Sequence, residues 1–116
     1  MEKRYRLQKN RTFQYVYHRG RSVACRDLVM LIAKGKGMKV GFSVSKKVGN
    51  AVVRNKVRRR LREIYRINED KRLPGYDLVL VARQRAVTGR FRDMEKEFLR
   101  LAKKLQLLRE DKENLS

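Results

Sequence analysis

Hydrophobic and polar residues along the chain follow two different periodicities, which predict strands in some segments and helices in others. Residues 38–48 alternate between apolar and polar side chains, the period of a strand with one buried face. Residues 28–33 and 77–82 are almost continuously apolar, which is typical of strands covered on both faces. The sequence therefore predicts at least three strands.

Helical spacing predicts three helices around these strands. Residues 91–108 repeat apolar side chains at three- and four-residue steps, the pattern of an amphipathic helix. A second helix should begin after Asn50, a residue type favoured at the N-cap, and end near Asn68. A short helix over residues 10–18 should stop at Gly20. Because both long helices need a surface to cover, we expect an α/β sandwich with the two on one face of a sheet.

The helix predicted after Asn50 combines a narrow apolar stripe with a dense basic surface. The apolar positions of this helix are Val53, Val57, Leu61 and Ile64. The remaining faces carry Arg54, Arg58, Arg59, Arg62 and Arg66. The only acid in the helix is Glu63, whereas exposed helix faces usually pair acids with bases at i,i+4. A phosphate backbone along this surface explains the pattern better than solvation does.

The composition also favours a polyanionic partner. The 116 residues predict one domain, and a hydrophobic fraction of 41% argues against a disordered polycation. Thirty-two Lys and Arg residues against 12 Asp and Glu residues give a formal net charge of +20. Each phosphate that such a protein neutralises releases counterions, which strengthens binding at low salt. Nucleic acid is therefore the first candidate partner, and an acidic membrane surface is the second.

The sequence contains no recognisable catalytic or metal site of its own. His18 and Cys25, the only histidine and the only cysteine, cannot form a zinc site unaided. The acids are scattered and form no cluster that would hold Mg²⁺. A phosphate-binding loop and a dinucleotide fingerprint are both missing. The lone cysteine fits a reducing, cytosolic compartment, and no apolar run approaches the roughly 20 residues of a membrane span.

Two features stay open on the residues alone. Phe13 and Tyr17 lie at i,i+4 in basic surroundings, so they could belong to the core or form a stacking surface for unpaired bases. Ser43 and Ser45 share the polar face of the alternating strand. That face could be an ordinary exposed sheet surface or could hold an extended single strand of nucleic acid.

Residues 42–62, which read FSVSKKVGNAVVRNKVRRRLR, closely resemble the signature of the bacterial ribonuclease P protein subunit. The likeness extends through most of residues 1–108. It implies a single domain over 1–108 with a flexible tail over 109–116. The implied fold is an α+β sandwich of the ribosomal protein S5 domain 2-like type. Its element order would be αβββαβα, with a left-handed βαβ crossover that departs from the usual right-handed rule.

The resemblance also implies a function. Members of this family bind a large catalytic RNA and support removal of the 5′ leader from precursor tRNA in the cytoplasm. The holoenzyme uses Mg²⁺, and its catalytic centre lies in the RNA, so no residue of this chain is expected to be catalytic. A metal site near the start of the basic helix is suggested for the family, and Asn55 is the only candidate ligand there.

The resemblance assigns two groups of residues to RNA. The residues that face the catalytic RNA would be Lys46, Lys47, Arg54, Asn55, Lys56, Arg58, Arg59, Arg62 and Arg66. A cleft for the single-stranded leader would be lined by Phe13, Tyr17, Val29, Leu31, Ser43 and Ser45.

Other classes of protein remain compatible with the composition. A structural ribosomal or general RNA-binding protein would show no preference for tRNA with a 5′ extension. A DNA-binding module would place the basic helix in the major groove, but the helix is framed by strands and lacks the partner helix of a helix-turn-helix. A membrane-surface helix would need an interfacial apolar face, which the sequence does not provide.

Overall fold

The computed structural model describes residues 10–109, with side chains from Gln14 onwards. The proposed tail beyond Arg109 and the side chain of Phe13 therefore lie outside the described part. The strands are β1 (Arg21–Ala24), β2 (Leu28–Lys34), β3 (Val40–Val44) and β4 (Tyr76–Ala82). The α-helices are α1 (Asn10–Arg19), α2 (Ala51–Asn68) and α3 (Phe91–Lys104). The predicted order αβββαβα is confirmed.

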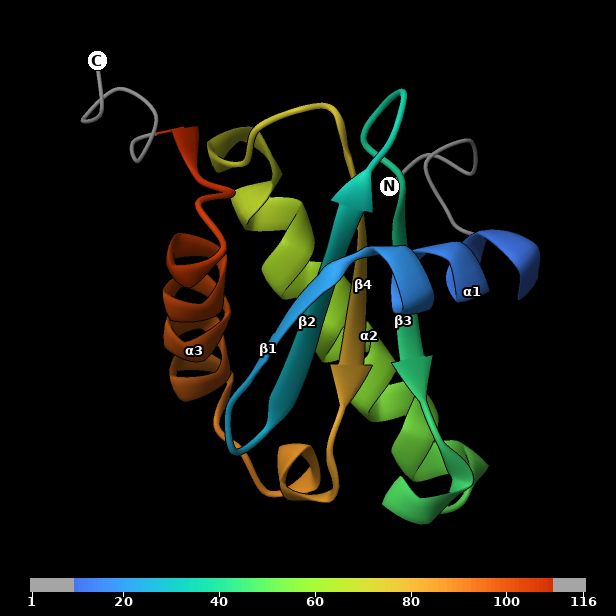
Figure 1. The fold of residues 1–116 in the computed structure, drawn as a ribbon. Coiled ribbons are helices and arrows are strands. Elements are labelled where there is room, and N and C mark those ends of the chain that lie inside the picture. The colour runs from blue at the N-terminus through green and yellow to red at the C-terminus, as the bar shows by residue number, and fades with distance from the viewer. Residues whose placement is uncertain (1–9, 110–116) are drawn as a thin grey trace.

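The four strands form one sheet in the order β1-β2-β4-β3. β4 is antiparallel to β2 and parallel to β3, so the chain must cross over between β3 and β4 through α2. In Figure 1 the arrows of β3 and β4 point downwards, α2 lies behind the sheet, and β4 lies to the left of β3. This arrangement makes the crossover left-handed, as the resemblance implies.

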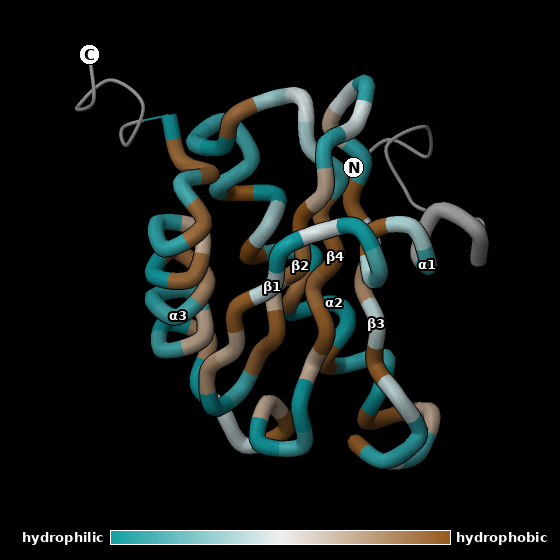
Figure 2. Tube along the Cα trace, in the orientation of Figure 1, coloured by the Kyte–Doolittle hydropathy of each residue, from teal (hydrophilic) through white to brown (hydrophobic). Residues whose placement is uncertain are grey.

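The helices lie on both faces of the sheet. α2 and α3 cover one face, while α1 crosses the other (Figure 1). The larger core lies between the sheet and the two long helices and includes Met30, Leu61, Leu80 and Phe98. A smaller cluster under α1 comprises Val16, Leu31, Ala33 and Val79. The hydropathy colouring shows the central strands as mostly apolar, as expected for strands covered on both faces (Figure 2).

The alternating segment predicted over residues 38–48 is only partly a strand. Val40 and Val44 face the larger core and are buried, as the alternation predicts. The strand ends at Val44, and Lys46–Val48 form one turn of 3₁₀ helix. The chain has to turn there because α2 begins at Ala51 and runs back along the sheet.

The close contact between α1 and the sheet explains Gly20. The backbone N–H of Gly20 donates to the carbonyl of Val16, 3.0 Å away, and closes the last turn of α1. A Cβ atom at this position would collide with the carbonyl oxygens of Val16 and Ile32. Glycine therefore ends α1 where the backbone touches β2, which confirms its predicted role.

The helix predicted over residues 91–108 ends earlier than the apolar pattern suggests. Gln106 has a φ of 56°, and it stops the helix in a left-handed conformation. The N–H groups of Leu107 and Gln106 donate to the carbonyls of Ala102 at 2.9 Å and Lys103 at 3.0 Å, which is a Schellman motif. Leu107 then folds back and is fully buried. The predicted apolar residue Leu108 belongs to this returning segment and not to the helix.

We expect Gln106→Gly to stabilise the protein by about 0.5–1 kcal/mol, because glycine adopts a positive φ without the steric cost of a Cβ. Chemical unfolding followed by circular dichroism would measure the change in the free energy of unfolding. Gln106→Ala is the matched control, since alanine keeps the Cβ, and it should give little change. An equal gain from both substitutions would contradict this explanation.

Candidate nucleic-acid interface

α2 is held to the sheet by the apolar stripe that the sequence predicts. Val57, Leu61 and Ile64 are buried in the larger core. Asn50 caps the helix, and its side-chain oxygen accepts a hydrogen bond from the backbone N–H of Val53 at 3.0 Å. The predicted N-cap and the predicted end of the helix near Asn68 are both confirmed. One face of α2 is therefore fixed, and the others are left for charged residues.

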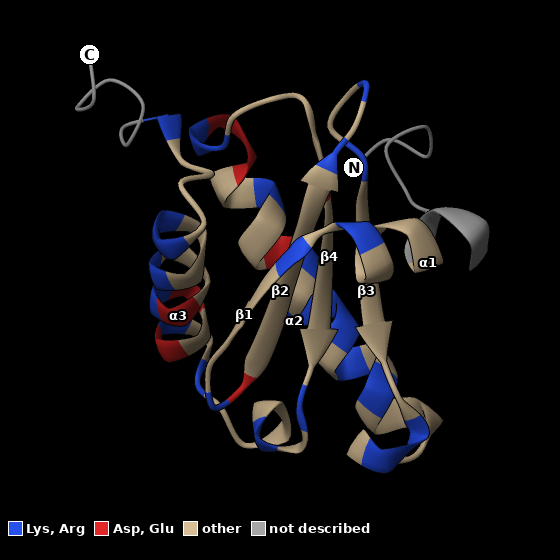
Figure 3. Cartoon of the chain, in the orientation of Figure 1, with Lys and Arg blue, Asp and Glu red and all other residues tan. Residues whose placement is uncertain are grey.

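Three arginines form a line along the flank of α2 that faces away from α3. Arg54, Arg58 and Arg62 follow one another at four-residue steps, and each is half-buried. Asn55 stands beside this line, and its side-chain oxygen accepts a hydrogen bond from Nη1 of Arg58 at 2.9 Å. Asn55 thus orients Arg58. Figure 3 shows the concentration of basic residues on the first turns of α2 and in the segment before it.

We use the name "ridge" for the predicted basic surface of α2 and the turn before it. The ridge comprises Lys46, Lys47, Arg54, Asn55, Lys56, Arg58, Arg59 and Arg62. Lys46, Lys47, Lys56 and Arg59 are exposed. Because no acid lies in the first turn of α2, the positive end of the helix dipole adds to the side-chain charges there.

Arg66 differs from the residues of the ridge. Its guanidinium donates to both carboxylate oxygens of Glu63, at 2.5 and 3.0 Å. The hydrogen bond from Arg66 holds the pKa of Glu63 below its usual range. The charge of Arg66 is thus offset locally, and its predicted contact with RNA would have to compete with Glu63.

The open face of the sheet carries the residues predicted to line the leader cleft. The strand register places Val29 beside Val81, and Val81 beside Ser43, in one row across three strands. Leu31 lies in the next row, is only 6% exposed and packs in the cluster with Val16. Leu31 therefore supports α1 and offers little surface to a ligand. Val29 and Ser43 remain partly exposed.

Tyr17 projects from α1 and is 60% exposed, so it is not a core residue. Its ring meets the ring of His18 edge to face, with centroids 5.6 Å apart. Val16 is fully buried and holds α1 against the sheet, whereas its neighbours Tyr15 and Tyr17 are both exposed. Tyr17 is thus an exposed aromatic side chain on the helix that packs against this face of the sheet. The side chain of its predicted partner, Phe13, is outside the described residues.

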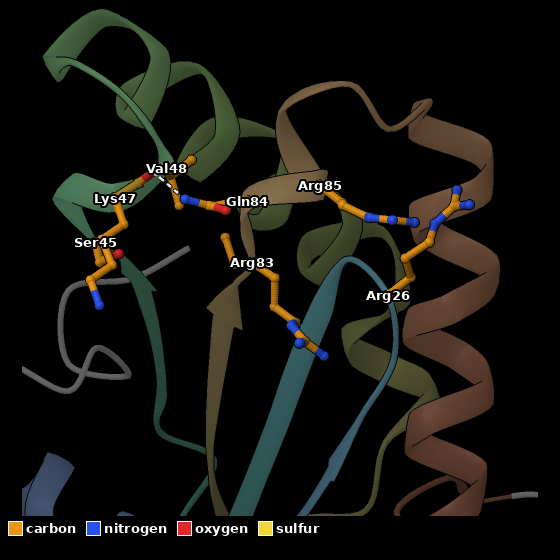
Figure 4. A pocket seen from close by; sticks show the side chains of 8 residues that line it. Arg26, Ser45, Lys47, Val48, Arg83, Gln84 and Arg85 are labelled. Carbon is orange, nitrogen blue, oxygen red and sulfur yellow. Dashed lines mark hydrogen bonds between the residues drawn. The ribbon is translucent and has the colours of Figure 1, made fainter.

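A basic pocket that the sequence alone does not predict lies at the carboxyl ends of β3 and β4. It has a volume of about 830 Å³. The residues that line it are Arg26, Ser45, Lys47, Val48, Ala82, Arg83, Gln84 and Arg85 (Figure 4). Gln84 bridges the two sides, because its side-chain N–H donates to the carbonyl of Lys47 at 3.1 Å. The sequence shows a basic loop after β4, but only the parallel pairing of β3 and β4 brings that loop beside Ser45 and Lys47.

The turn between β1 and β2 holds one wall of this pocket. Nη1 of Arg83 donates to the carbonyl of Cys25 at 3.0 Å, and the Arg83 backbone N–H donates to the carbonyl of Asp27 at 2.8 Å. The thiol of Cys25 donates to Glu97 of α3 at 3.4 Å. Asp27 is 1% exposed, and its carboxyl also contacts Glu97. α3 thereby fixes the turn that positions Arg83.

Burial has electrostatic consequences in this region. It raises the pKa of Glu97, and the neighbouring carboxyl of Asp27 raises it further. Burial also raises the pKa of the Cys25 thiol, so this cysteine is a protonated donor near neutral pH. The cluster is thus a structural support beneath the pocket and carries no nucleophile.

Within residues 10–109 no group of three or more His, Cys, Asp or Glu side chains is placed to hold a metal ion. The side-chain oxygen of Asn55, the candidate ligand of the suggested metal site, accepts a hydrogen bond from the cationic Arg58. None of the described helices combines the length and the apolar character that crossing a membrane requires.

A basic helix anchored on a sheet, an exposed aromatic residue beside an open sheet face and a cationic pocket define a nucleic-acid-binding α/β protein. The profile of the Ribonuclease P family matches residues 1–106. The chain therefore belongs to the ribonuclease P protein family.

Individual relatives agree with this assignment. The ribonuclease P protein component of Natranaerobius thermophilus is 44% identical over 107 residues, which cover 90% of this chain and 93% of the relative. That of Clostridioides difficile is 43% identical and covers 87% of this chain and 91% of its own length. The solved RNase P protein of Staphylococcus aureus superimposes with a TM-score of 0.81 at 34% identity, covering 90% of this chain and 97% of that one. The RNase P protein of Thermotoga maritima gives 0.77 at 30% identity, covering 85% and 96%.

We expect Glu97→Gln to raise the melting temperature at neutral pH. A raised pKa means that Glu97 stabilises the fold when protonated, and that this contribution is lost as the pH rises through the folded-state pKa. Glutamine stays neutral and keeps an oxygen to accept the hydrogen bond of Cys25. The variant and the parent should therefore converge below about pH 4, where the carboxyl is protonated in both states.

Thermal unfolding between acid and neutral pH would measure this effect. Asp93→Asn is the control, because Asp93 is exposed in the first turn of α3, where a negative charge is favourable. That control should melt at a lower temperature at neutral pH. A Glu97→Gln variant that melts below the parent at neutral pH would show that the partly buried carboxylate is stabilising.

Proposed function

We propose that this subunit uses two surfaces for RNA: the ridge for the catalytic RNA, and the cleft between α1 and the open sheet face for the 5′ leader of precursor tRNA. The observation that carries the proposal is the continuity of the cleft with the basic pocket. Ser43 and Ser45 follow each other at two-residue spacing on one face of β3 and its extension, as do Val81 and Arg83 on β4. The floor of the cleft therefore leads directly into the pocket.

Such a surface suits an extended single strand. Tyr17 offers a ring on which an unpaired base can stack, and stacking of this kind is worth about 1–3 kcal/mol per base. Small side chains on the sheet, such as Ser43 and Val29, leave room for a backbone to pass. The cations of the pocket would then neutralise phosphates farther along the leader. Only 5′-extended tRNA can reach all of these groups.

The chemistry of cleavage is assigned to the RNA in this proposal. The described side chains include no cluster that would hold Mg²⁺. No residue of this chain is predicted to be catalytic. Mg²⁺ would supply the activation of water and the stabilisation of charge at the scissile phosphate, held mainly by RNA. The residues of this chain would bind and position the two RNAs. We place this activity in the cytoplasm.

Binding of the leader also accounts for turnover. The mature tRNA lacks the leader, so it loses the contacts with Tyr17 and with the pocket after cleavage. Substrate is thereby bound more tightly than product, which favours release of the mature tRNA. Family membership favours this role over that of a structural ribosomal protein.

The first test is multiple-turnover cleavage of a 5′-extended precursor tRNA by a bacterial ribonuclease P RNA at moderate Mg²⁺, with and without this protein. We expect a clear gain in the rate with the protein, and a smaller gain when the leader is shortened to one nucleotide. Tight RNA binding without any gain would contradict the proposal.

We expect Tyr17→Ala to weaken binding of long-leader precursor tRNA to the holoenzyme by about 1–3 kcal/mol, the value of one lost base stack. Binding of mature tRNA should not change. Tyr15→Ala is the matched control, because Tyr15 is also exposed, at 47%. Two positions from Tyr17 along the helix, it lies on nearly the opposite side of α1. Equal losses from the two variants, or an equal loss for mature tRNA, would exclude Tyr17 as a leader contact.

The pocket makes a separate prediction. The double variant Arg26→Gln/Arg85→Gln should weaken binding of long leaders and leave the shortest leader unaffected, because only a long leader reaches the pocket. Lys34→Gln/Lys36→Gln is the control, since it removes two exposed charges near the turn between β2 and β3. Binding constants measured over a series of leader lengths would show the difference. A loss that is independent of leader length would place the pocket outside the leader path.

A further inference from the structure

The outward face of α3 carries a line of basic residues that the ridge, the cleft and the pocket do not include. Arg92, Lys96, Arg100 and Lys104 follow one another at four-residue steps, and all four are exposed. We call this line the α3 stripe. At a rise of about 1.5 Å per residue it is roughly 18 Å long. Figure 3 shows the basic segments on the outer edge of α3, away from α1.

The acids of α3 do not neutralise this stripe. Glu95 accepts a hydrogen bond from the side chain of Asn68 at 2.8 Å, on the flank that faces α2. Glu97 is turned towards Cys25 and Asp27 on the opposite flank. Asp93 is exposed in the first turn, where its negative charge interacts favourably with the helix dipole. Among side chains 14–109, no member of the stripe has an ion-pair partner.

An uncompensated stripe of this kind weakens the free protein. Like charges at i,i+4 on a helix repel each other, so the repeated pairs along α3 oppose helix formation. The chain keeps the stripe although the flanks of the same helix carry acids. An anionic partner that lies along the helix would remove the repulsion.

The stripe is separate from the arginine line of the ridge but connected to the ridge surface. Arg54, Arg58 and Arg62 face away from α3. On the other side of α2 a groove of about 360 Å³ leads towards the start of α3. The groove is lined by Lys56, Arg59, Arg60, Glu63 and Phe91. Nη1 of Arg60 donates to the carbonyl of Gly89 at 3.2 Å, which ties α2 to the loop before α3.

We propose that the α3 stripe binds the phosphate backbone of an RNA double helix in the catalytic RNA, as a second contact beyond the ridge. The inference rests on the proposed function of the ridge, whose basic surface continues through the groove to α3. A double helix fits better than a single strand because no aromatic ring is exposed along the stripe: Phe98 is buried and Phe91 packs against the core. A membrane surface fits less well, because no large apolar side chain is exposed on α3.

The test compares three double variants of the full chain in complexes with a bacterial ribonuclease P RNA. The stripe variant is Lys96→Gln/Arg100→Gln, the ridge variant is Arg58→Gln/Arg62→Gln, and the control is Lys34→Gln/Lys36→Gln. Each variant lowers the formal net charge from +20 to +18, so any general effect of charge is matched. Binding constants measured over a salt series give the number of phosphates contacted.

We expect the stripe variant to reduce the slope of log K against log salt by about 1.5, which corresponds to two lost phosphate contacts. The control should change the slope by much less. In hydroxyl-radical footprints of the RNA, the stripe variant should lose protection of a helical segment that the control retains. Its melting temperature should equal or exceed that of the parent, which excludes misfolding as the cause.

Three results would overturn the inference. If the ridge variant binds the RNA more weakly but the stripe variant behaves like the control, the second contact is excluded and the proposed function stands. If the ridge variant also behaves like the control, the proposed function is excluded, and the inference that rests on it is excluded too. A stripe variant that loses binding only to vesicles of anionic phospholipid would assign α3 to a membrane surface.

Discussion

The parallel pairing of β3 with β4 determines where the ridge, the cleft and the pocket lie. Parallel strands share one carboxyl edge, so the segments that follow Val44 and Ala82 must meet there. The connecting helix has to return from that edge to the other, and α2 therefore begins beside the pocket. Because the crossover places α2 on the face opposite α1, the other face is left with one short helix over it. The proposed leader cleft is the uncovered part of that face.

The positive charge at the start of α2 favours the binding of an anion at this edge of the sheet. Backbone N–H groups at a helix N-terminus already favour an anion, and this helix adds Lys47 before its first turn and Arg54 within it. No acid in the first turn offsets them. The free protein is destabilised by this concentration of positive charge, whereas a complex with phosphates is stabilised by it. The same residues that weaken the isolated chain thus increase its affinity for RNA.

Local sequence signals predicted the elements well, because their causes lie within a few residues. The cap at Asn50 and the apolar stripe through Val57 and Leu61 depend only on neighbours along the helix. The end of α3 could not be predicted in this way. Leu107 continues the apolar pattern, but it reaches the core through a reversal at Gln106 that the periodicity does not register.

The candidate site likewise has parts that local sequence signals predict and parts that depend on the fold. The basic side chains of α2 share one element, so their spacing already indicates one surface. The pocket joins Lys47 to Arg83 and Arg26 from three distant segments, and their proximity depends on strand order. Leu31 shows the reverse case, because the resemblance assigns it to the cleft while α1 covers it with Val16. Tyr17 could be placed only when the orientation of α1 was known.

Four of the 12 acids help to explain how so basic a protein can fold and still present cations to RNA. Asp27 and Asp77 are buried, and Glu95 and Glu97 are turned towards the flanks of α3. Burial raises the pKa of Asp77, while the nearby charges of Lys39 and Arg72 lower it in part. Glu95 and Glu97 accept hydrogen bonds from Asn68 and Cys25, and the charge of Asp77 acts on the buried Arg72. Because they are used inside the fold, most of the surface cations stay uncompensated, and that excess is what a phosphate backbone can bind.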